Sequence, residues 1–311
     1  MSALSISNKS STLEYFLPCL NGPVKVRLDS NSSKSIQKSH KTFSHLLKNG
    51  EKIYGVTTGF GDLSSIPIDV NDQRKLQLNL IRSHATGVGK SFDPGITRII
   101  MLLKLLNWSK GVSGVRTKLV QLLKNFLNHD ILPEIPRQGS VGASGDLAPL
   151  AHMALPLIGE GLVNFQGRIM PAMLAMKEVG LEPIILEPKE GLSIINGTQV
   201  STAIAIKACI DAENILKVAD LSGAMSVEAS LSSRSVFKSE IHKLKGHPGQ
   251  RIVASNVWNL LNKSQIVLSH KNCDRLQDPY SFRCIPQVHG ISRENYKCVK
   301  EIVENEANSV S

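Results

Sequence analysis

The segment GSVGASGDLAPL, residues 139–150, crowds glycine, alanine and serine around one hydroxyl group and then turns apolar. A phosphate-binding loop requires GxxxxGK[ST], but here Gly145 is followed by Asp146, whose charge would repel phosphate. The glycines are three residues apart with no strand-forming run before them, which excludes a dinucleotide-binding turn. Ser144 lies in Gly-Ala-Ser-Gly-Asp rather than in GxSxG, so a hydrolase nucleophile elbow is excluded as well.

The remaining chemistry uses the backbone of the segment itself. In a tight bend the amide nitrogen of Gly145 can reach the carbonyl carbon of Ala143 and close a five-membered ring. Loss of two water molecules then leaves Ser144 as an exocyclic methylene, which is a strong electrophile. Gly145 has no Cβ to obstruct the bend, Ala143 is small, and the serine supplies the β-hydroxyl that must leave. The alternative is a plain turn, capped by Asp146, before a helix over residues 147–157.

Most of the chain shows helical periodicity from residue 69 onward, after a mixed entry segment over residues 1–35 in which VKVRLD predicts a short strand. The predicted helices are 96–107; 119–127, opened by Ser113 or Gly114; and a long buried helix over 198–229, eased at Gly223.

Four segments rich in glycine, proline and polar residues interrupt these helices. Binding residues are often carried on loops that a rigid scaffold holds in place. The four candidate site segments are IYGVTTGFGDLSSIP, GSVGASGDLAPL, KEGLSIINGTQ and RLQDPYSFRCIPQVHG.

Composition narrows the function classes. The net charge of +10 is scattered and lacks the interleaved aromatic residues of a stacking platform, so we expect no nucleic-acid partner. The odd number of cysteines, five, and the absence of a CxxC pair predict a reduced cytoplasmic protein, and the polar N-terminus does not resemble a secretory signal. The most apolar run, IIMLLKLLNW, is broken by Lys104 and falls short of the ~20 residues that cross a bilayer, so we expect no membrane partner.

The longer segment GSVGASGDLAPLAHMAL resembles the signature of the aromatic amino acid ammonia-lyases. In that family Ala-Ser-Gly forms the 4-methylidene-imidazole-5-one (MIO) group autocatalytically, here from Ala143, Ser144 and Gly145, and no metal or dissociable cofactor is needed. The resemblance implies a mainly α fold. The implied organisation is an MIO-bearing N-terminal domain over residues 1–195 and the start of a long central helical bundle over residues 196–311, with the C-terminal half missing.

Three further motifs stand in the family's order. IYGVTTGFG resembles the tyrosine loop, which implies that Tyr54 is the base for the β-proton. KEGLSIINGTQVSTA resembles the motif in which an asparagine, here Asn196, lies near the substrate and the MIO group. QDPYSFRCIPQVHG resembles the segment that supplies Gln277, catalytic Tyr280 and Arg283, where the arginine would hold the substrate carboxylate.

The pair Ser83-His84 in LNLIRSHATGVG resembles the substrate selector of the histidine-specific members of the family. Phe-Leu or His-Leu there would indicate phenylalanine or tyrosine lyases, and L-tyrosine and L-phenylalanine remain alternative substrates. His84 can hydrogen-bond an imidazole. The resemblance therefore implies the first step of histidine degradation, in which L-histidine yields trans-urocanate and ammonia. A histidine on an ordinary helix face is the structural alternative.

The chain departs from the family pattern at Thr57, Ile285 and His289, and it ends at Ser311 where the family's bundle continues. The resemblance implies a homotetramer in which a neighbouring subunit donates the Tyr280 and Arg283 segment. Two hypotheses follow. The first is an enzyme, which either works with a separately encoded C-terminal half or is represented here by a fragment. The second is a catalytically inactive or regulatory homologue.

Overall fold

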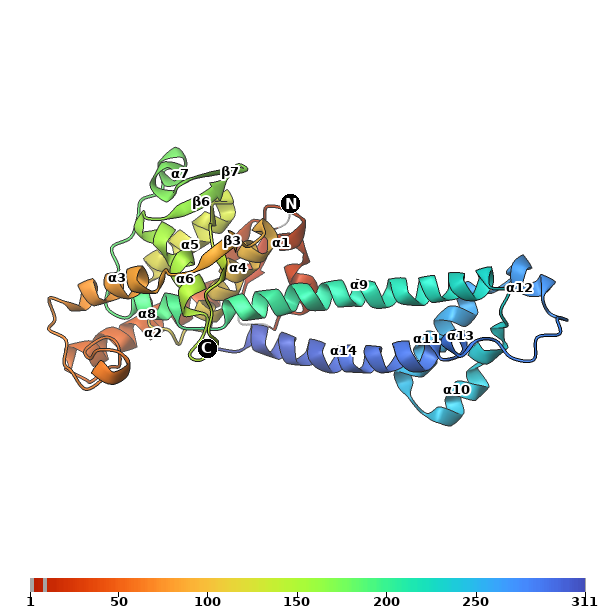
Figure 1. Cartoon of the computed structure of the whole chain (residues 1–311). Coiled ribbons are helices and arrows are strands. Elements are labelled where there is room, and N and C mark those ends of the chain that lie inside the picture. The colour runs from red at the N-terminus through yellow and green to blue at the C-terminus, as the bar shows by residue number, and fades with distance from the viewer. Residues whose placement is uncertain (1–2, 8–9, 311) are drawn as a thin grey trace. The chain divides into compact units, whose positions relative to one another are not determined.

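The computed structural model describes residues 3–7 and 10–310 and separates into two compact units. Unit 1 contains the residues up to Ile206 together with those from Glu304 onward, and unit 2 contains Lys207–Val303. Helices dominate both units, which confirms the mainly α fold (Figure 1). The predicted domain boundary between residues 195 and 196 stays a prediction.

The core of unit 1 surrounds α4 (Pro94–Ser109), whose residues from Thr97 to Ser109 are all buried. Its long apolar run, broken by Lys104 within IIMLLKLLNW, explains why α1, α2 and α5 pack against it. The prediction of a helix over 96–107 is confirmed. The other helices that begin in unit 1 are α1 (Leu17–Asn21), α2 (Ser30–Lys48), α3 (Gln73–His84), α5 (Thr117–His129), α6 (Leu147–Ala154), α7 (Ala172–Glu178), α8 (Glu190–Ile195) and α9 (Gln199–Ala229).

Two helices differ from their predicted form. The helix over 119–127 is confirmed as α5, but it begins at Thr117 because Gly114 has a left-handed φ of +71°, which ends any helix that would start there. Helix α2 was not predicted, because its serine- and lysine-rich sequence hides the narrow buried stripe that contains Ile36 and Phe43.

Small sheets connect the helices of unit 1. Strands β1 (Leu4–Ile6) and β2 (Val26–Leu28) pair in parallel, and β2 confirms the predicted strand. Strands β4 (Leu132–Pro133), β6 (Leu162–Phe165) and β7 (Arg168–Pro171) form an antiparallel sheet in that order. Strand β3 (Val88–Ser91) pairs antiparallel with β5 (Pro136–Gln138). The expectation that no strand precedes the glycine-rich segment is wrong, because β5 ends one residue before it; proline and charge conceal so short an edge strand.

Helix α9 confirms the long helix predicted over 198–229 and runs unbroken through Gly223. The expectation that this helix is buried is wrong, because most of its residues are partly or fully exposed. The glycine serves close packing instead, since a Cβ there would lie 3.3 Å from the Ile285 side chain of α14. Figure 1 shows α14 lying alongside α9 in unit 2. The helices that begin in unit 2 are α10 (Ser239–Lys245), α11 (Pro248–Leu260), α12 (Gln265–Ser269), α13 (Tyr280–Arg283) and α14 (Ile285–Asn308).

Two residues that depart from the family pattern make contacts within unit 2. Ile285 belongs to a buried apolar cluster with Val227, Phe237 and Val257. The Nδ1 atom of His289 hydrogen-bonds the buried carboxylate of Asp220 at 3.0 Å. These departures therefore have structural roles.

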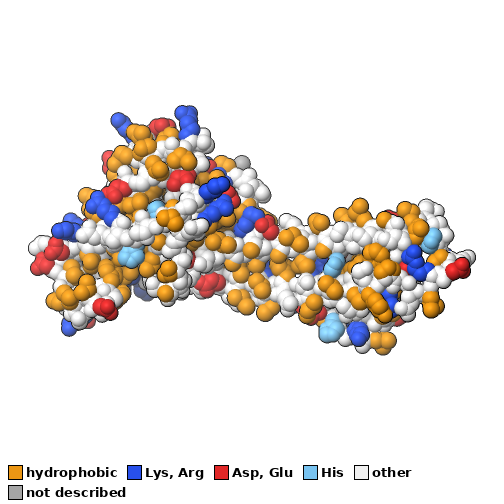
Figure 2. All heavy atoms as spheres, viewed as in Figure 1, with side chains coloured by type: hydrophobic (Ala, Val, Ile, Leu, Met, Phe, Trp, Pro, Cys, Tyr) orange, Lys and Arg blue, Asp and Glu red, His pale blue; other side chains and the backbone are white. Residues whose placement is uncertain are grey.

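Unit 2 also exposes many apolar side chains, which appear as orange patches over its helices in Figure 2. On α9 they include Ile215, Val218 and Met225, each more than 60% exposed. Exposed apolar area of this extent is typical of surfaces that pack against another chain. Among the helices of the described residues, none combines the length and apolarity needed to span a bilayer.

Candidate active site

The Ala143-Ser144-Gly145 turn lies in the exposed loop between β5 and α6. Gly145 adopts a φ of +113°, which strains any other residue. A Cβ added there would lie 2.7 Å from the carbonyl oxygen of Gly197. The turn is therefore bent and pressed against the Gly197 backbone in a way that only glycine permits.

Asp146 fixes this bend. Its N–H donates a 2.7 Å hydrogen bond to the Gly197 carbonyl. Its carboxylate, on a residue only 1% exposed, accepts from the backbone N–H groups of Val200 at 2.9 Å and Ser201 at 2.8 Å. The hydroxyls of Ser140 and Ser201 also donate to it, each at 2.7 Å. The proposed cap of the following helix is wrong: this side chain caps α9, where the helix N-terminus favours a negative charge.

Asn196 is exposed in the short break between α8 and α9, next to Gly197. The start of α8 is anchored by Glu190, which is 1% exposed and accepts from the Arg116 guanidinium at 2.7 and 3.0 Å. The hydrogen bond to this carboxylate raises the pKa of Arg116. Asn196 and the Ala-Ser-Gly turn thus meet at one backbone segment.

Tyr54 is 54% exposed, and its Oη accepts a 3.0 Å hydrogen bond from the N–H of Gly61. Its ring packs edge-on against Phe60, with 5.8 Å between ring centroids. Thr57, one of the departures, accepts from the N–H of Ile53 at 2.8 Å and so helps to close the loop.

The buried side chain of Gln77 on α3 ties the tyrosine loop to α8. Its Nε2 donates to the carbonyl of Gly55 at 2.9 Å, and its Oε1 accepts from the N–H of Leu192 at 3.1 Å. Both bonds are buried or nearly so, where an unpaired polar group is costly. One side chain therefore couples the residue after Tyr54 to the helix that leads to Asn196.

His84 ends α3 and is partly buried. Its Nδ1 lies 2.8 Å from the carbonyl oxygen of Leu80 and 3.1 Å from the hydroxyl oxygen of Ser83. Among the described residues, no hydrogen bond involves its Nε2, so that nitrogen is available to a ligand.

The chain after His84 is tied to α6. The N–H of Gly87 donates to Nε2 of His152 on α6 at 3.0 Å. Burial lowers the pKa of His152 and so favours the neutral imidazole that can accept this bond. Helices α3, α6 and α8 also pack directly against one another. The helix that carries His84 is therefore held by the helix that follows the turn.

Gln277, Tyr280 and Arg283 form a second cluster, in unit 2. Arg283 donates from Nη1 to Oε1 of Gln277 at 2.7 Å, and its guanidinium lies 5.1 Å from the centre of the Tyr280 ring. Tyr280 is 72% exposed. Gln277 and Arg283 line a cavity of about 620 Å³.

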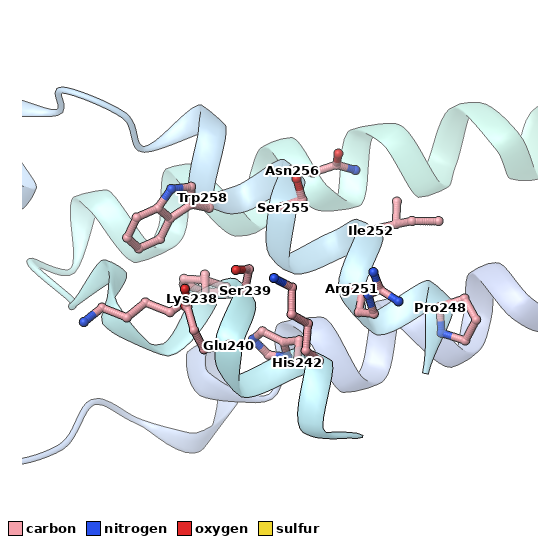
Figure 3. Close-up of a pocket in the computed structure, with 12 residues that line it drawn as sticks. Lys238, Ser239, Glu240, His242, Pro248, Arg251, Ile252, Ser255, Asn256 and Trp258 are labelled. Carbon is pink, nitrogen blue, oxygen red and sulfur yellow. The ribbon is translucent and has the colours of Figure 1, made fainter. Parts of the chain in front are cut away.

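A second cavity in unit 2, of about 690 Å³, lies between α10 and α11 (Figure 3). Its labelled lining residues include Lys238, His242, Arg251 and Trp258. Both ring nitrogens of His242 are already occupied, by the carbonyl of Val236 and the side chain of Gln250. None of the predicted site residues lines this cavity.

Sequence reasoning missed Gln77, His152 and the real partner of Asp146, and it treated Lys104 only as a break in an apolar run. The one local signal was that lone charge within IIMLLKLLNW. The contacts of the missed residues join segments that are far apart in the chain; Gln77 and Leu192, for example, are 115 positions apart.

Residues 12–311 match the family model described as Aromatic amino acid lyase. The chain is 44% identical over 312 residues to histidine ammonia-lyase of Photorhabdus laumondii, covering all of this chain and 61% of that protein. The chain therefore spans about three-fifths of the length of such relatives.

Two solved structures illustrate the shared fold. Ergothionase from Treponema denticola is 28% identical with a TM-score of 0.93, over 99% of this chain and 62% of that one. Histidine ammonia-lyase from Trypanosoma cruzi is 33% identical with a TM-score of 0.89, over 99% and 57%. The chain therefore belongs to the aromatic amino acid lyase family, a family of ammonia-lyases.

Proposed function

We propose that the protein is a histidine ammonia-lyase, which converts L-histidine to trans-urocanate and ammonia in the first step of histidine degradation. The observation that carries the proposal is the left-handed bend at Gly145, closed by the hydrogen bond from Asp146 to Gly197 beside Asn196. The identity of 44% to a histidine ammonia-lyase supports the choice of substrate.

The residues of the turn fit the MIO group. In ring closure, the Gly145 nitrogen bonds to the Ala143 carbonyl carbon, and that oxygen leaves as water with the amide hydrogens of Ser144 and Gly145. A second water takes the hydroxyl and α-hydrogen of Ser144. Within the described chain the N–H of Gly145 donates to no acceptor, and Ser144 is exposed, so attack and loss of water are both unobstructed. The group supplies an electrophile that withdraws electrons from the substrate.

The chain's own side chains then bind the substrate and move one proton. Tyr54 presents an exposed Oη, oriented by Gly61 and Phe60, as the base for the β-proton. Asn196 offers an amide beside the turn. His84 hydrogen-bonds the substrate imidazole through Nε2, and Arg283 binds the carboxylate, with Gln277 orienting the guanidinium and Tyr280 beside it.

The active protein is a homotetramer of the cytoplasm, in which the Tyr280–Arg283 segment serves the site of a neighbouring copy. The exposed apolar side chains of unit 2 support assembly with further copies. Assembly is then a condition for turnover.

The proposal is tested by incubating purified protein separately with L-histidine, L-phenylalanine and L-tyrosine and following the ultraviolet absorbance of each unsaturated product. We expect urocanate from L-histidine, none from the Ser144→Ala control, and loss of the histidine preference in His84→Leu. A tetrameric sample that carries the dehydrated turn but deaminates only phenylalanine or tyrosine would contradict the substrate assignment.

A further inference from the structure

Lys104 is a buried cation to which the proposed chemistry gives no role. It lies in the middle of α4, the most apolar helix of unit 1, and is 0% exposed. Burial lowers the pKa of its ammonium to about 7, against an opposing attraction from Asp146. Burying a charge in an apolar core costs stability, so packing alone does not account for a lysine here.

The contacts of Lys104 lead to the candidate site. Its Nζ donates to the carbonyl oxygen of Ser193 at 3.4 Å, and the indole N–H of Trp108 donates to the same oxygen at 3.4 Å. Ser193 lies in the last turn of α8, where carbonyl groups lack donors within the helix and favour a neighbouring cation. Lys104 and Trp108 therefore hold the end of α8.

The charge of Asp146 acts at the other side of the same break in the chain. It caps the first turn of α9 through the N–H groups of Val200 and Ser201. Lys104 therefore lies at the C-terminal end of α8, which favours a cation, and Asp146 lies at the N-terminal end of α9, which favours an anion. The two charges attract each other across the break between these helices. Gly197, against which Gly145 is pressed, lies within this break.

We propose that Lys104 is a positioning residue for ring closure: held by Ser193 and attracted by Asp146, it keeps the backbone at Gly197 where it forces the Ala143-Ser144-Gly145 turn to bend. The inference rests on the proposed function, since ring closure is the event that it assists. Lys104 acts through the backbone and contacts neither the turn nor the substrate.

The test compares intact masses of four purified full chains: the wild type, Lys104→Met, Lys104→Arg and Arg98→Met. Methionine fills the same space without charge, and arginine restores the charge. Arg98 is the matched control, because it is a second buried cation of α4 but pairs with Asp130. We expect loss of two waters in the wild type, Lys104→Arg and Arg98→Met, and retention of both waters in most of the folded Lys104→Met chains.

Four results would overturn the inference. The first two are full dehydration of Lys104→Met and an equal loss of dehydration in Arg98→Met. The third is failure of Lys104→Met to fold by circular dichroism, which would mean that the charge serves packing. The fourth is failure of Lys104→Arg to dehydrate, which would mean that the charge is not the cause. Absence of dehydration in the wild type is a separate outcome, which contradicts the proposed function itself and removes the event that Lys104 assists.

Discussion

The N–H of Asp146 donates a 2.7 Å hydrogen bond to the carbonyl of Gly197, and this bond joins the residue after the Ala-Ser-Gly turn to the residue after Asn196. Two segments some fifty positions apart thus share one backbone contact. Every contact described for the turn lies within unit 1. The bend therefore depends on residues that this chain contains.

Substitution of Gly145 by alanine should prevent the bend. The new Cβ would lie 2.7 Å from the Gly197 oxygen in addition to the strain of a positive φ, so we expect a loss of about 2 kcal/mol or more of stability and no dehydration. Gly142→Ala is the control, because Gly142 also has a positive φ, of +66°, but its Cβ would meet open space. Thermal unfolding and intact mass measure both effects; equal behaviour of the two variants would contradict the steric argument.

Replacement of Asp146 by asparagine should weaken the anchor of the turn. Each carboxylate oxygen accepts two hydrogen bonds, and an amide NH₂ can accept none, so two donors lose their partner. We expect a loss of about 2 kcal/mol or more in denaturant unfolding, with slower dehydration. Asp29→Asn is the control: Asp29 caps α2 through one bond to the N–H of Ser32, which asparagine can accept equally well. If both variants lose the same stability, the anchor is an ordinary helix cap.

Much of this arrangement could be predicted from the sequence, but only where local pattern carried it. Apolar periodicity predicted α4, α5 and α9, and short motifs pointed to Tyr54 and Asn196. The contacts of Gln77 with Leu192 and of Lys104 with Ser193 could not be predicted, because each joins residues about a hundred positions apart. Helix α2 was missed because its buried stripe is narrow within a polar sequence.

Removal of the Gln77 bridge should loosen the tyrosine loop. Gln77→Leu leaves the carbonyl of Gly55 and the N–H of Leu192 without their partner, at a cost of about 2 kcal/mol. We expect faster limited proteolysis around Tyr54 and lower turnover of L-histidine in the assembled protein. Gln37→Leu, at an exposed position on α2, should change neither. Unchanged proteolysis of Gln77→Leu would contradict a bridging role.

The buried ammonium of Lys104 should make stability depend on pH. Its pKa is lowered by burial from 10.5 to about 7, so between these values the unfolded chain binds more protons than the folded chain. The free energy of unfolding therefore rises by a few kcal/mol as pH increases from 7 to 10, and the same amount is lost when pH is lowered from 10 to 7. Denaturant unfolding of the wild type and Lys104→Met should differ most at pH 7, where methionine is the more stable, and converge near pH 10. A constant difference would contradict this assignment.

The most direct test of the central claim, that the residues around the turn bend it into a dehydrated electrophile, is the intact mass of the purified 311-residue chain. The account predicts a mass lower than the sequence mass by two waters for the wild type, and the full sequence mass for Ser144→Ala. A folded wild-type chain at its full sequence mass would contradict the account, because every contact described for the bend is already present within unit 1.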